Sequence, residues 1–317
     1  MRRFLVDADT ASDDAVALVM VLHQEDVQVE AITVVAGNVP LSQGVQNALY
    51  TVEICGKHTP VYAGMAAPIQ RPLRTAQFVH GEDGMSDIGL PLTGRTPASG
   101  HAVDIIRQIV HKYPGEITLV TLGPLTNIAM ALLLDPSLPG LIKECVTMGG
   151  TGQGYGNITP VAEYNIWVDP EAARIVYAAG LPLTMVGWDI SRQWATFSPA
   201  EAKALRSVGT KLAIFCVDIQ KKLQEFALKN KLPGFDLADP ITMAVALDSA
   251  TVVEKKRLFV DVETGGNLCQ GQTVVDHLAI TGKKPNCDVV LKALRQRFLD
   301  ILYASVRSPG QPHEPLE

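Results

Sequence analysis

Four carboxylates fall within eight residues near the start of the chain, at Asp7, Asp9, Asp13 and Asp14. Like charges this close repel strongly unless a cation lies among them. Helix capping by Ser12 or Asp13 would use one or two of the acids and would leave the others without a role. Because no His or Cys is close by in sequence, the cluster predicts a hard cation with oxygen ligands, Ca²⁺ or Mg²⁺.

Polar side chains also follow several of the other expected strands. They include Asn38, His80, Asn157, Glu163, Asn165 and Asp239. Asn and Glu side chains without a basic neighbour in sequence suit neutral hydroxyl groups better than phosphates. The glycine-rich segment 150–154 resembles a phosphate cradle, but residues 157–160 do not continue it as a helix, which argues against a dinucleotide fingerprint. Asp239-Pro240 on its own fits a helix N-cap with Pro at the first helical position.

Short strand-like runs alternate with helical periods over the first part of the chain. The expected strands cover residues 3–6, 27–35, 60–62, 116–122, 143–148 and 183–186, and the expected helices cover 13–23, 42–54, 100–112, 125–134 and 170–179. Ser42 is a candidate cap for the second helix. This alternation predicts an α/β fold with an open, mainly parallel, Rossmann-like sheet and helices on both faces. Such sheets bind their ligands outside the carboxyl ends of the strands.

The C-terminal part is expected to be more helical, with helices over 199–207, 211–229, 239–247 and 288–306. Two runs, 257–263 and 273–278, predict an antiparallel edge. No linker divides the chain, so residues 1–307 are expected to form a single domain. The final segment 308–317 carries three Pro and one Gly and is predicted to be disordered.

Composition excludes several classes of protein. The 317 residues are 47% hydrophobic and 19% charged, which is typical of a globular chain. The net charge of −6 and the scattered basic residues argue against a nucleic-acid partner. The longest apolar stretch, 117–134, is interrupted by Gly123 and Pro124, and the apolar run after the basic N-terminus is too short for a signal peptide. We therefore expect no membrane partner and a cytoplasmic location. The five Cys are far apart and are expected to be buried free thiols.

Taken together, the motifs resemble those of the inosine-uridine preferring nucleoside hydrolase family. The family's opening D-x-D-x-x-x-D-D-A is matched by Asp7, Asp9, Asp13, Asp14 and Ala15, with Ala11 where members commonly have Gly. The other matching segments occur in the family's order, at 37–38, 80–81, 122–127, 148–150, 156–170 and 239–240. The resemblance implies hydrolysis of the N-glycosidic bond of unphosphorylated ribonucleosides to ribose and free base.

The resemblance also implies a metal site. Asp9, Asp14 and Asp239 would bind Ca²⁺ together with the backbone carbonyl of Leu122, and Asp7 would support these ligands without binding the ion itself. Asp9 would also be the catalytic general base, which takes a proton from a Ca²⁺-bound water as that water attacks the oxocarbenium-like sugar. Asp239 is then a metal ligand and not a helix cap.

The sugar contacts follow from the same resemblance. Asp13, Asn38 and Asn165 would hold the 2′- and 3′-hydroxyls, and Asn157 with Glu163 would hold the 5′-hydroxyl. No Arg or Lys stands among these motif residues, so a phosphorylated substrate is not expected. The assemblies usual in the family imply a homodimer or a homotetramer.

One position departs from the family pattern. Many members have His immediately before the metal-binding Asp, where it is thought to protonate the leaving base, and this chain has Ala238. His80 could supply the proton instead, or Trp188 and Trp194 could stack on a purine and make it basic enough to take its proton from water. A structural role is the alternative for each of these three side chains. The stacking route predicts a preference for purine ribosides over pyrimidine ribosides.

Two other functions fit parts of the sequence. Asp7-Ala8-Asp9-Thr10 after a first strand also matches the D-x-D-x-T of a haloacid dehalogenase-type phosphatase, with Asp7 as nucleophile, Asp9 as acid/base and Mg²⁺ as the metal. That function needs a phosphate-binding Lys and an acidic pair at later strand ends, and the sequence offers neither convincingly. A ribose-binding protein without enzymatic activity is the third possibility, although such modules usually carry an export signal.

Overall fold

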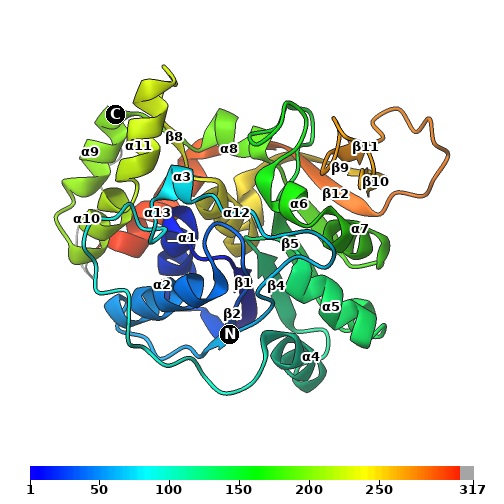
Figure 1. Ribbon diagram of the computed structural model, residues 1–317, viewed down its shortest axis with the longest axis horizontal. Helices are drawn as coiled ribbons and strands as arrows, with labels where there is room; N and C mark the ends of the chain where they lie inside the picture. Colours follow the sequence, from blue (N-terminus) through cyan, green and yellow to red (C-terminus); the bar gives the residue numbers. More distant parts are fainter. Residues whose placement is uncertain (308–317) are drawn as a thin grey trace.

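The computed structural model describes residues 1–307 and is built around an eight-stranded sheet (Figure 1). Across the sheet the strands follow the order β3 (Val61–Ala63), β2 (Val27–Val34), β1 (Arg2–Ala8), β4 (Ile117–Thr121), β5 (Glu144–Met148), β6 (Leu183–Val186), β12 (Cys287–Ala293) and β9 (Val252–Leu258). Neighbouring strands are parallel except for β12 and β9, which are antiparallel. The predicted open, mainly parallel α/β sheet is confirmed.

Helices cover both faces of the sheet because the strands carry apolar side chains on both sides. In β1, Phe4, Val6 and Ala8 belong to one hydrophobic cluster and Leu5 belongs to the other. The first cluster includes α1 (Ser12–Leu22), α2 (Leu41–Ile54), α12 (Ala238–Leu247) and α13 (Arg295–Val306). The second includes α4 (Ala102–Lys112), α5 (Thr126–Leu134) and α7 (Pro170–Ala178), so the sheet lies between two helical layers (Figure 1).

Shorter elements connect these layers. The helices are α3 (Gln77–His80), α6 (Tyr164–Val168), α8 (Trp188–Trp194), α9 (Pro199–Arg206), α10 (Lys211–Asp218) and α11 (Lys221–Lys229). Two short pairs of strands are antiparallel: β7 (Thr196–Phe197) with β8 (Phe235–Asp236), and β10 (Val260–Val262) with β11 (Thr273–Val275). Single 3₁₀ turns cover Leu138–Gly140 and Ser249–Thr251.

The strand order reverses at β1. The chain passes from β1 outward to β2 and β3, then returns to β4 on the other side of β1 and continues to β5 and β6. Loops that leave the carboxyl ends of β1 and β4 therefore run in opposite directions, and ligands of such sheets bind at this switch point. Asp9 follows β1 and Leu122 follows β4, so both stand at the switch point.

The sequence predicts a single helix over 288–306, and this prediction is wrong. Val289, Val290 and Leu291 are buried in β12, between β6 and β9, and helix α13 begins only at Arg295. A short apolar run with β-branched residues cannot be distinguished from a helix by its period alone. The expected strand 257–263 is divided between the end of β9 and β10, and the edge strand β9 begins earlier than predicted, at Val252.

The expected helix 211–229 is broken into α10 and α11. At the break the carbonyl of Ile219 accepts a hydrogen bond from Ser86 Oγ (2.6 Å), and Gln220 Nε2 donates to the carbonyl of Ser12 (2.8 Å). Tertiary hydrogen bonds thus engage the residues at which a continuous helix would have passed. Ser42 does not cap α2, which begins one residue earlier, at Leu41.

Within residues 1–307 no helix is both long and apolar enough to cross a bilayer. All five Cys are free thiols, and all but Cys269 are buried. The segment 308–317, predicted to be disordered, lies outside the described residues. The single domain over 1–307 stays a prediction.

Candidate active site

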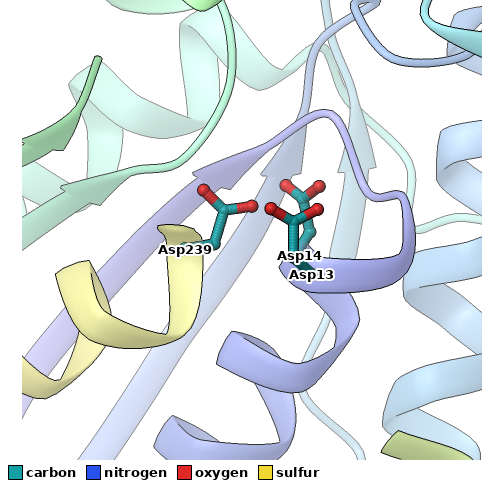
Figure 2. Close-up of side chains that lie close together, drawn as sticks. All are labelled: Asp13, Asp14 and Asp239. Atoms are coloured by element: carbon teal, nitrogen blue, oxygen red, sulfur yellow. The ribbon is translucent and has the colours of Figure 1, made fainter. Parts of the chain in front are cut away.

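Three carboxylates from two helices converge beside the carboxyl end of the sheet. Asp13 and Asp14 stand in the first turn of α1, and Asp239 stands in the first turn of α12. Each offers one oxygen, and these oxygens lie within 4.8 Å of one another. Figure 2 shows the carboxylates of Asp14 and Asp239 facing each other, with Asp13 beside Asp14. Asp239 is not the helix cap that its spacing alone suggested, because α12 begins at Ala238 after Leu237.

Helix capping accounts for only one of these acids. The carboxylate of Asp14 accepts hydrogen bonds from the backbone N–H groups of Asp9 (3.2 Å) and Ala11 (2.9 Å), so it closes the turn that leads into α1. Neither Ser12 nor Asp13, the caps expected from the sequence, has that role, because α1 begins at Ser12 with Ala11 as the capping residue. The convergence of the remaining acids needs another cause.

Asp9 is held between two glycines that leave no room for another side chain. A Cβ on Gly37 would lie 2.1 Å from Asp9 Oδ2, and one on Gly123 would lie 2.8 Å from Asp9 Oδ1. The backbone N–H of Asn38 donates to Oδ2 (2.6 Å), whereas Oδ1 is buried and has no hydrogen-bond partner among residues 1–307. Asp9 is therefore tightly positioned, with one oxygen available for a ligand.

The converging group differs from the predicted ligand set in one member. It contains Asp13, which the resemblance assigns to the sugar, and it does not contain Asp9, which the resemblance assigns to the metal. Burial raises the pKa of both Asp14 and Asp239, and neighbouring carboxylates, that of Asp9 among them, raise both further. Asp9 therefore lies within electrostatic reach of the group although it is not one of its three members.

Asp7, at the end of β1, adds a further buried acid. Its Oδ1 accepts hydrogen bonds from Thr33 Oγ1 (2.6 Å) and Asn127 Nδ2 (2.8 Å). Burial raises the pKa of Asp7 to about 7 and also raises that of Asp9 to about 7, so ionisation of either carboxyl is unfavourable without a counter-charge. Asp7 Oδ2, Asp9 Oδ1 and Asp13 Oδ1 are buried without a partner in the described chain. This donor set fits a divalent cation with oxygen ligands.

Asn165 links the end of β4 to the short helix α6. Its Nδ2 donates to the carbonyl of Leu122 (2.8 Å), the backbone oxygen that the resemblance assigns to the metal. Glu163 caps α6: its Oε1 accepts from the backbone N–H of Asn165 (2.8 Å) and its Oε2 from that of Gly150 (2.9 Å). Burial raises the pKa of Glu163 to about 7 against these bonds. Glu163 thus joins the glycine-rich loop to α6.

Asn157 lies on the glycine-rich loop between β5 and α6. Its Oδ1 accepts a hydrogen bond from the backbone N–H of Tyr164 (2.9 Å). The carboxylate of Asp189 holds the same loop, because it accepts from the backbone N–H groups of Gly152 (2.8 Å) and Gln153 (3.1 Å). These backbone N–H groups are already bonded within the protein, which agrees with the rejection of a dinucleotide fingerprint.

His80 is buried at the end of α3 and contacts the acidic turn. Its Nδ1 lies 3.0 Å from Ser12 Oγ. Burial lowers the pKa of His80, the nearby Asp13 carboxylate raises it, and the net shift is downward. His80 is therefore mostly neutral at about pH 7, a state that suits hydrogen bonding better than protonation of a leaving group.

A cavity of about 330 Å³, a size that suits a small molecule, lies at this site. All seven side chains that the sequence analysis assigns to the substrate line it: Asp13, Asn38, His80, Asn157, Glu163, Asn165 and Trp188. Leu122, Ala238 and Asp239 also line it, whereas Asp9 and Asp14 are fully buried and take no part in its wall. Trp188 comes from α8 and not from a strand end, and Trp194 is not a lining residue.

The cavity wall also contains residues that sequence reasoning missed. They include Phe78, Tyr155, Arg192, Phe226, Leu232 and Asp236. Arg192 and Asp236 form an ion pair (Nη1 to Oδ2, 2.7 Å) although they are 44 residues apart in sequence. No spacing rule links residues this distant, so the sequence carries no signal for this pair and the three-dimensional structure is needed to find it.

Comparison with known proteins decides the family. The profile described as "Inosine-uridine preferring nucleoside hydrolase" matches residues 4–300. The chain belongs to this family. It is 37% identical over 303 residues to the pyrimidine-specific ribonucleoside hydrolase RihA of Salmonella agona (strain SL483), and the alignment covers 94% of this chain and 96% of RihA.

Solved structures of nucleoside hydrolases have the same fold. The plant nucleoside hydrolase PpNRh1 superimposes with a TM-score of 0.92 at 29% identity, over 97% of this chain and 99% of that chain. The purine-preferring ribonucleoside hydrolase from Gardnerella vaginalis has a TM-score of 0.89 at 30% identity, over 96% of this chain and 98% of that chain. This nucleoside hydrolase is therefore an N-glycosyl hydrolase that acts on ribonucleosides, and the phosphatase and ribose-binding alternatives are wrong.

The buried acids link the stability of this nucleoside hydrolase to pH. In the folded protein the pKa values of Asp7, Asp9 and Glu163 are raised to about 7. In an unfolded chain such groups titrate at about pH 4. The folded state thus binds more protons between these values, and the free energy of unfolding of the metal-free protein falls as pH rises from about 4 to about 7. A cation that binds the ionised carboxylates opposes this loss.

We expect the melting temperature in chelator to be lower at about pH 8 than at about pH 6, and Ca²⁺ to reduce or reverse that difference. Circular dichroism melts at both pH values, with EDTA or with excess Ca²⁺, measure the effect. A melting temperature that is the same under all four conditions would contradict the assignment of a cation to these carboxylates.

Proposed function

We propose that this nucleoside hydrolase cleaves unphosphorylated ribonucleosides in the cavity at the switch point of the sheet. The observation that carries the proposal is that Asp13 and Asp239, two of the three converging carboxylates, line the same cavity as Asn38 and Asn165. Carboxylates and amides suit the hydroxyl groups of a ribose. Trp188 and other apolar side chains at the cavity suit a flat base.

Asp9, Asp14, Asp239 and the carbonyl of Leu122 would hold Ca²⁺, and the unpartnered Oδ1 of Asp9 and the convergence of Asp14 with Asp239 support this assignment. Ca²⁺, when bound, supplies positive charge that lowers the pKa of a water beside it. Asp13 is close enough to Asp14 and Asp239 to contribute to the same site. Hard oxygen ligands favour Ca²⁺ or Mg²⁺, and the family resemblance favours Ca²⁺.

Asp9 would act as the general base. Its Oδ2 accepts the backbone N–H of Asn38 (2.6 Å), which orients the carboxylate and leaves Oδ1 for the proton of the attacking water. A cation bound beside Asp9 would favour its ionised carboxylate, the form that accepts a proton. The water oxygen bonds to C1′ of the ribose as the glycosidic bond breaks, and the electron pair of that bond leaves with the base.

Asp13, Asn38 and Asn165 would hold the 2′- and 3′-hydroxyls, and Asn157 and Glu163 the 5′-hydroxyl. Each of the last two already accepts hydrogen bonds from backbone N–H groups, so their side chains are oriented before a ligand arrives. Asp7 would stabilise this arrangement from the end of β1. Contacts that strengthen as the sugar ring flattens lower the barrier to hydrolysis.

For the leaving base, stacking on Trp188 is the route that we favour. Ala238 offers no proton, and the lowered pKa of His80 leaves little of that side chain in the protonated form at neutral pH. The stacking route favours purine ribosides. RihA, the relative at 37% identity, is named pyrimidine-specific, whereas the structural relative from Gardnerella vaginalis is named purine-preferring, so the names of relatives leave the base to experiment. Assembly as a homodimer or homotetramer and a cytoplasmic location also stay predictions.

Replacement of Asp9 by Asn should preserve the fold and remove the general base. We expect kcat for inosine to fall by at least ~10²–10⁴-fold, because a positioned base contributes that much and the metal site is weakened as well. Release of reducing sugar measures the activity, and exhaustive chelation of the wild type should have a similar effect. Asp218→Asn, on an exposed ion pair with Arg206, is the matched control and should retain activity. Inosine hydrolysis by Asp9→Asn within tenfold of the wild type would contradict the assignment.

Changes at the 2′ and 5′ positions of the ribose should both lower kcat/KM. 2′-Deoxyinosine leaves the polar partners of the 2′-hydroxyl unpaired, and inosine 5′-monophosphate brings a phosphate to the Glu163 carboxylate. We expect kcat/KM for each to be lower than for inosine by roughly 10²-fold or more. Assays at equal enzyme concentration measure all three substrates. Comparable kcat/KM for inosine and either analogue would show that the hydroxyl contacts are misassigned.

Trp188→Ala tests the stacking route. We expect the substitution to lower kcat/KM for inosine by roughly tenfold, in line with a lost aromatic contact, and to affect uridine less. Trp194→Ala, on the same helix but outside the cavity wall, is the matched control. Wild-type turnover of uridine faster than that of every purine riboside would contradict the purine preference.

A further inference from the structure

Arg192 is the only Lys or Arg among the residues of the 1–307 range that line the cavity. It lies on α8, four residues after Trp188, so the two side chains project from the same side of the helix. Both line the cavity. A permanent positive charge therefore stands one helical turn from the aromatic ring that we assign to the base.

Asp236 holds the Arg192 side chain in place. Arg192 Nη1 donates to Asp236 Oδ2 (2.7 Å), and the other oxygen of Asp236 accepts a hydrogen bond from Thr196 Oγ1 (2.5 Å). The side chains of Arg192 and Asp236 are 20% and 5% exposed, so the pair is more shielded from water than a surface ion pair. Asp236 ends β8 just before α12, which begins at Ala238 and carries Asp239.

The chemistry of the guanidinium restricts what it can recognise. A guanidinium has five N–H donors and no acceptor, and Arg192 engages Asp236 and also the Tyr155 side chain, which leaves further N–H donors for a ligand. Its remaining donors suit an oxygen acceptor and do not suit an amino group. Ala238, at the position where many family members have His, adds only a methyl group to the cavity wall. Arg192 is thus the cationic group that this wall offers to a leaving base.

We propose that Arg192 donates a hydrogen bond to a carbonyl oxygen of the base, and that this contact makes the enzyme prefer bases with an oxo group over their amino counterparts. The inference rests on the proposed function, since it places the base against Trp188. Among purines it predicts hypoxanthine over adenine, which differ in having an oxygen or an amino group at one ring carbon. It is independent of whether purines or pyrimidines are preferred.

The same contact would assist departure of the base. When the bond between C1′ and the ring nitrogen breaks, its electron pair remains on the base, and negative charge spreads onto the carbonyl oxygen. A guanidinium donor at that oxygen stabilises the charge without giving up a proton. The attacking water supplies the oxygen that bonds to C1′, its proton passes to Asp9, and the departing base takes up one proton, so the step balances as nucleoside plus water to ribose plus base.

The test compares inosine, adenosine and 4-nitrophenyl β-D-ribofuranoside as substrates of the wild type, Arg192→Met and Arg192→Lys. The nitrophenolate leaves readily without help and so reports on the sugar end alone. We expect the wild type to have a higher kcat/KM for inosine than for adenosine. Arg192→Met should lower that ratio by about tenfold, as expected for loss of one hydrogen bond to a charged group, and leave the nitrophenyl riboside within about twofold. Arg192→Lys should restore part of the ratio.

Two further variants separate recognition from folding. Arg192→Met leaves Asp236 buried without its partner, so the double variant Arg192→Met/Asp236→Asn removes that charge and should show the same altered ratio. Arg206→Met breaks the exposed ion pair with Asp218 and should leave the ratio unchanged. An inosine-to-adenosine ratio in the double variant that equals the wild-type ratio would overturn the proposal, as would an equal loss for all three substrates. A wild type that hydrolyses the nitrophenyl riboside but no nucleoside would overturn the proposed base site, and one that hydrolyses neither would overturn the proposed function.

Discussion

Negative charge buried away from water is the constraint on which the rest of this structure depends. Asp9 and Asp14 are fully buried and Asp239 is 3% exposed, so each ionised carboxylate needs nearby positive charge or hydrogen-bond donors. The fold supplies part of that need, because α1 and α12 both begin at the site and direct the positive ends of their dipoles toward the acids. Helices α1 and α12 lie more than two hundred residues apart in sequence, and the acids they carry meet because both helices pack in the same hydrophobic cluster on the sheet. The cation that we propose here would complete the balance and would link its binding to folding.

Several polar side chains that line the cavity also form hydrogen bonds to backbone groups. Glu163 caps α6 and binds the glycine-rich loop, Asn165 binds the Leu122 carbonyl, and Asn157 accepts a hydrogen bond from the N–H of Tyr164. Such shared bonds orient the side chains before a ligand arrives, which lowers the entropic cost of bringing a sugar into reactive geometry. The glycines beside Asp9 allow the backbone to approach its carboxylate closely, because a Cβ at either position would collide with it.

The sequence permitted strong predictions wherever the chemistry was concentrated in short segments. The acidic turn 7–14 and the polar segment 156–170 were recognisable from residue type and order, and the side chains assigned to the substrate do line one cavity. Prediction failed where a contact depends on distant segments or on a short ambiguous run. Arg192 and Asp236 meet through a tertiary ion pair. The sequence predicts helix where β12 lies, because a buried strand and a buried helix share an apolar composition. The hydrogen bonds at Ile219 and Gln220, between α10 and α11, come from distant parts of the chain.

The two ends of the cavity are encoded in different parts of the chain. Much of the apolar wall, with Trp188, Phe226 and Leu232, derives from the continuous stretch 188–238, which also carries the Arg192–Asp236 ion pair. The cavity-lining amides Asn38, Asn157 and Asn165 and the acids Asp13 and Glu163 precede residue 170. Genetic exchange of this one stretch, as a cassette, would therefore alter the wall that we propose for the base and retain the side chains that we propose for the ribose. Such modularity gives evolution a simple path from one preferred nucleoside to another, because the residues proposed to cleave the glycosidic bond lie outside this stretch and need not change with the base.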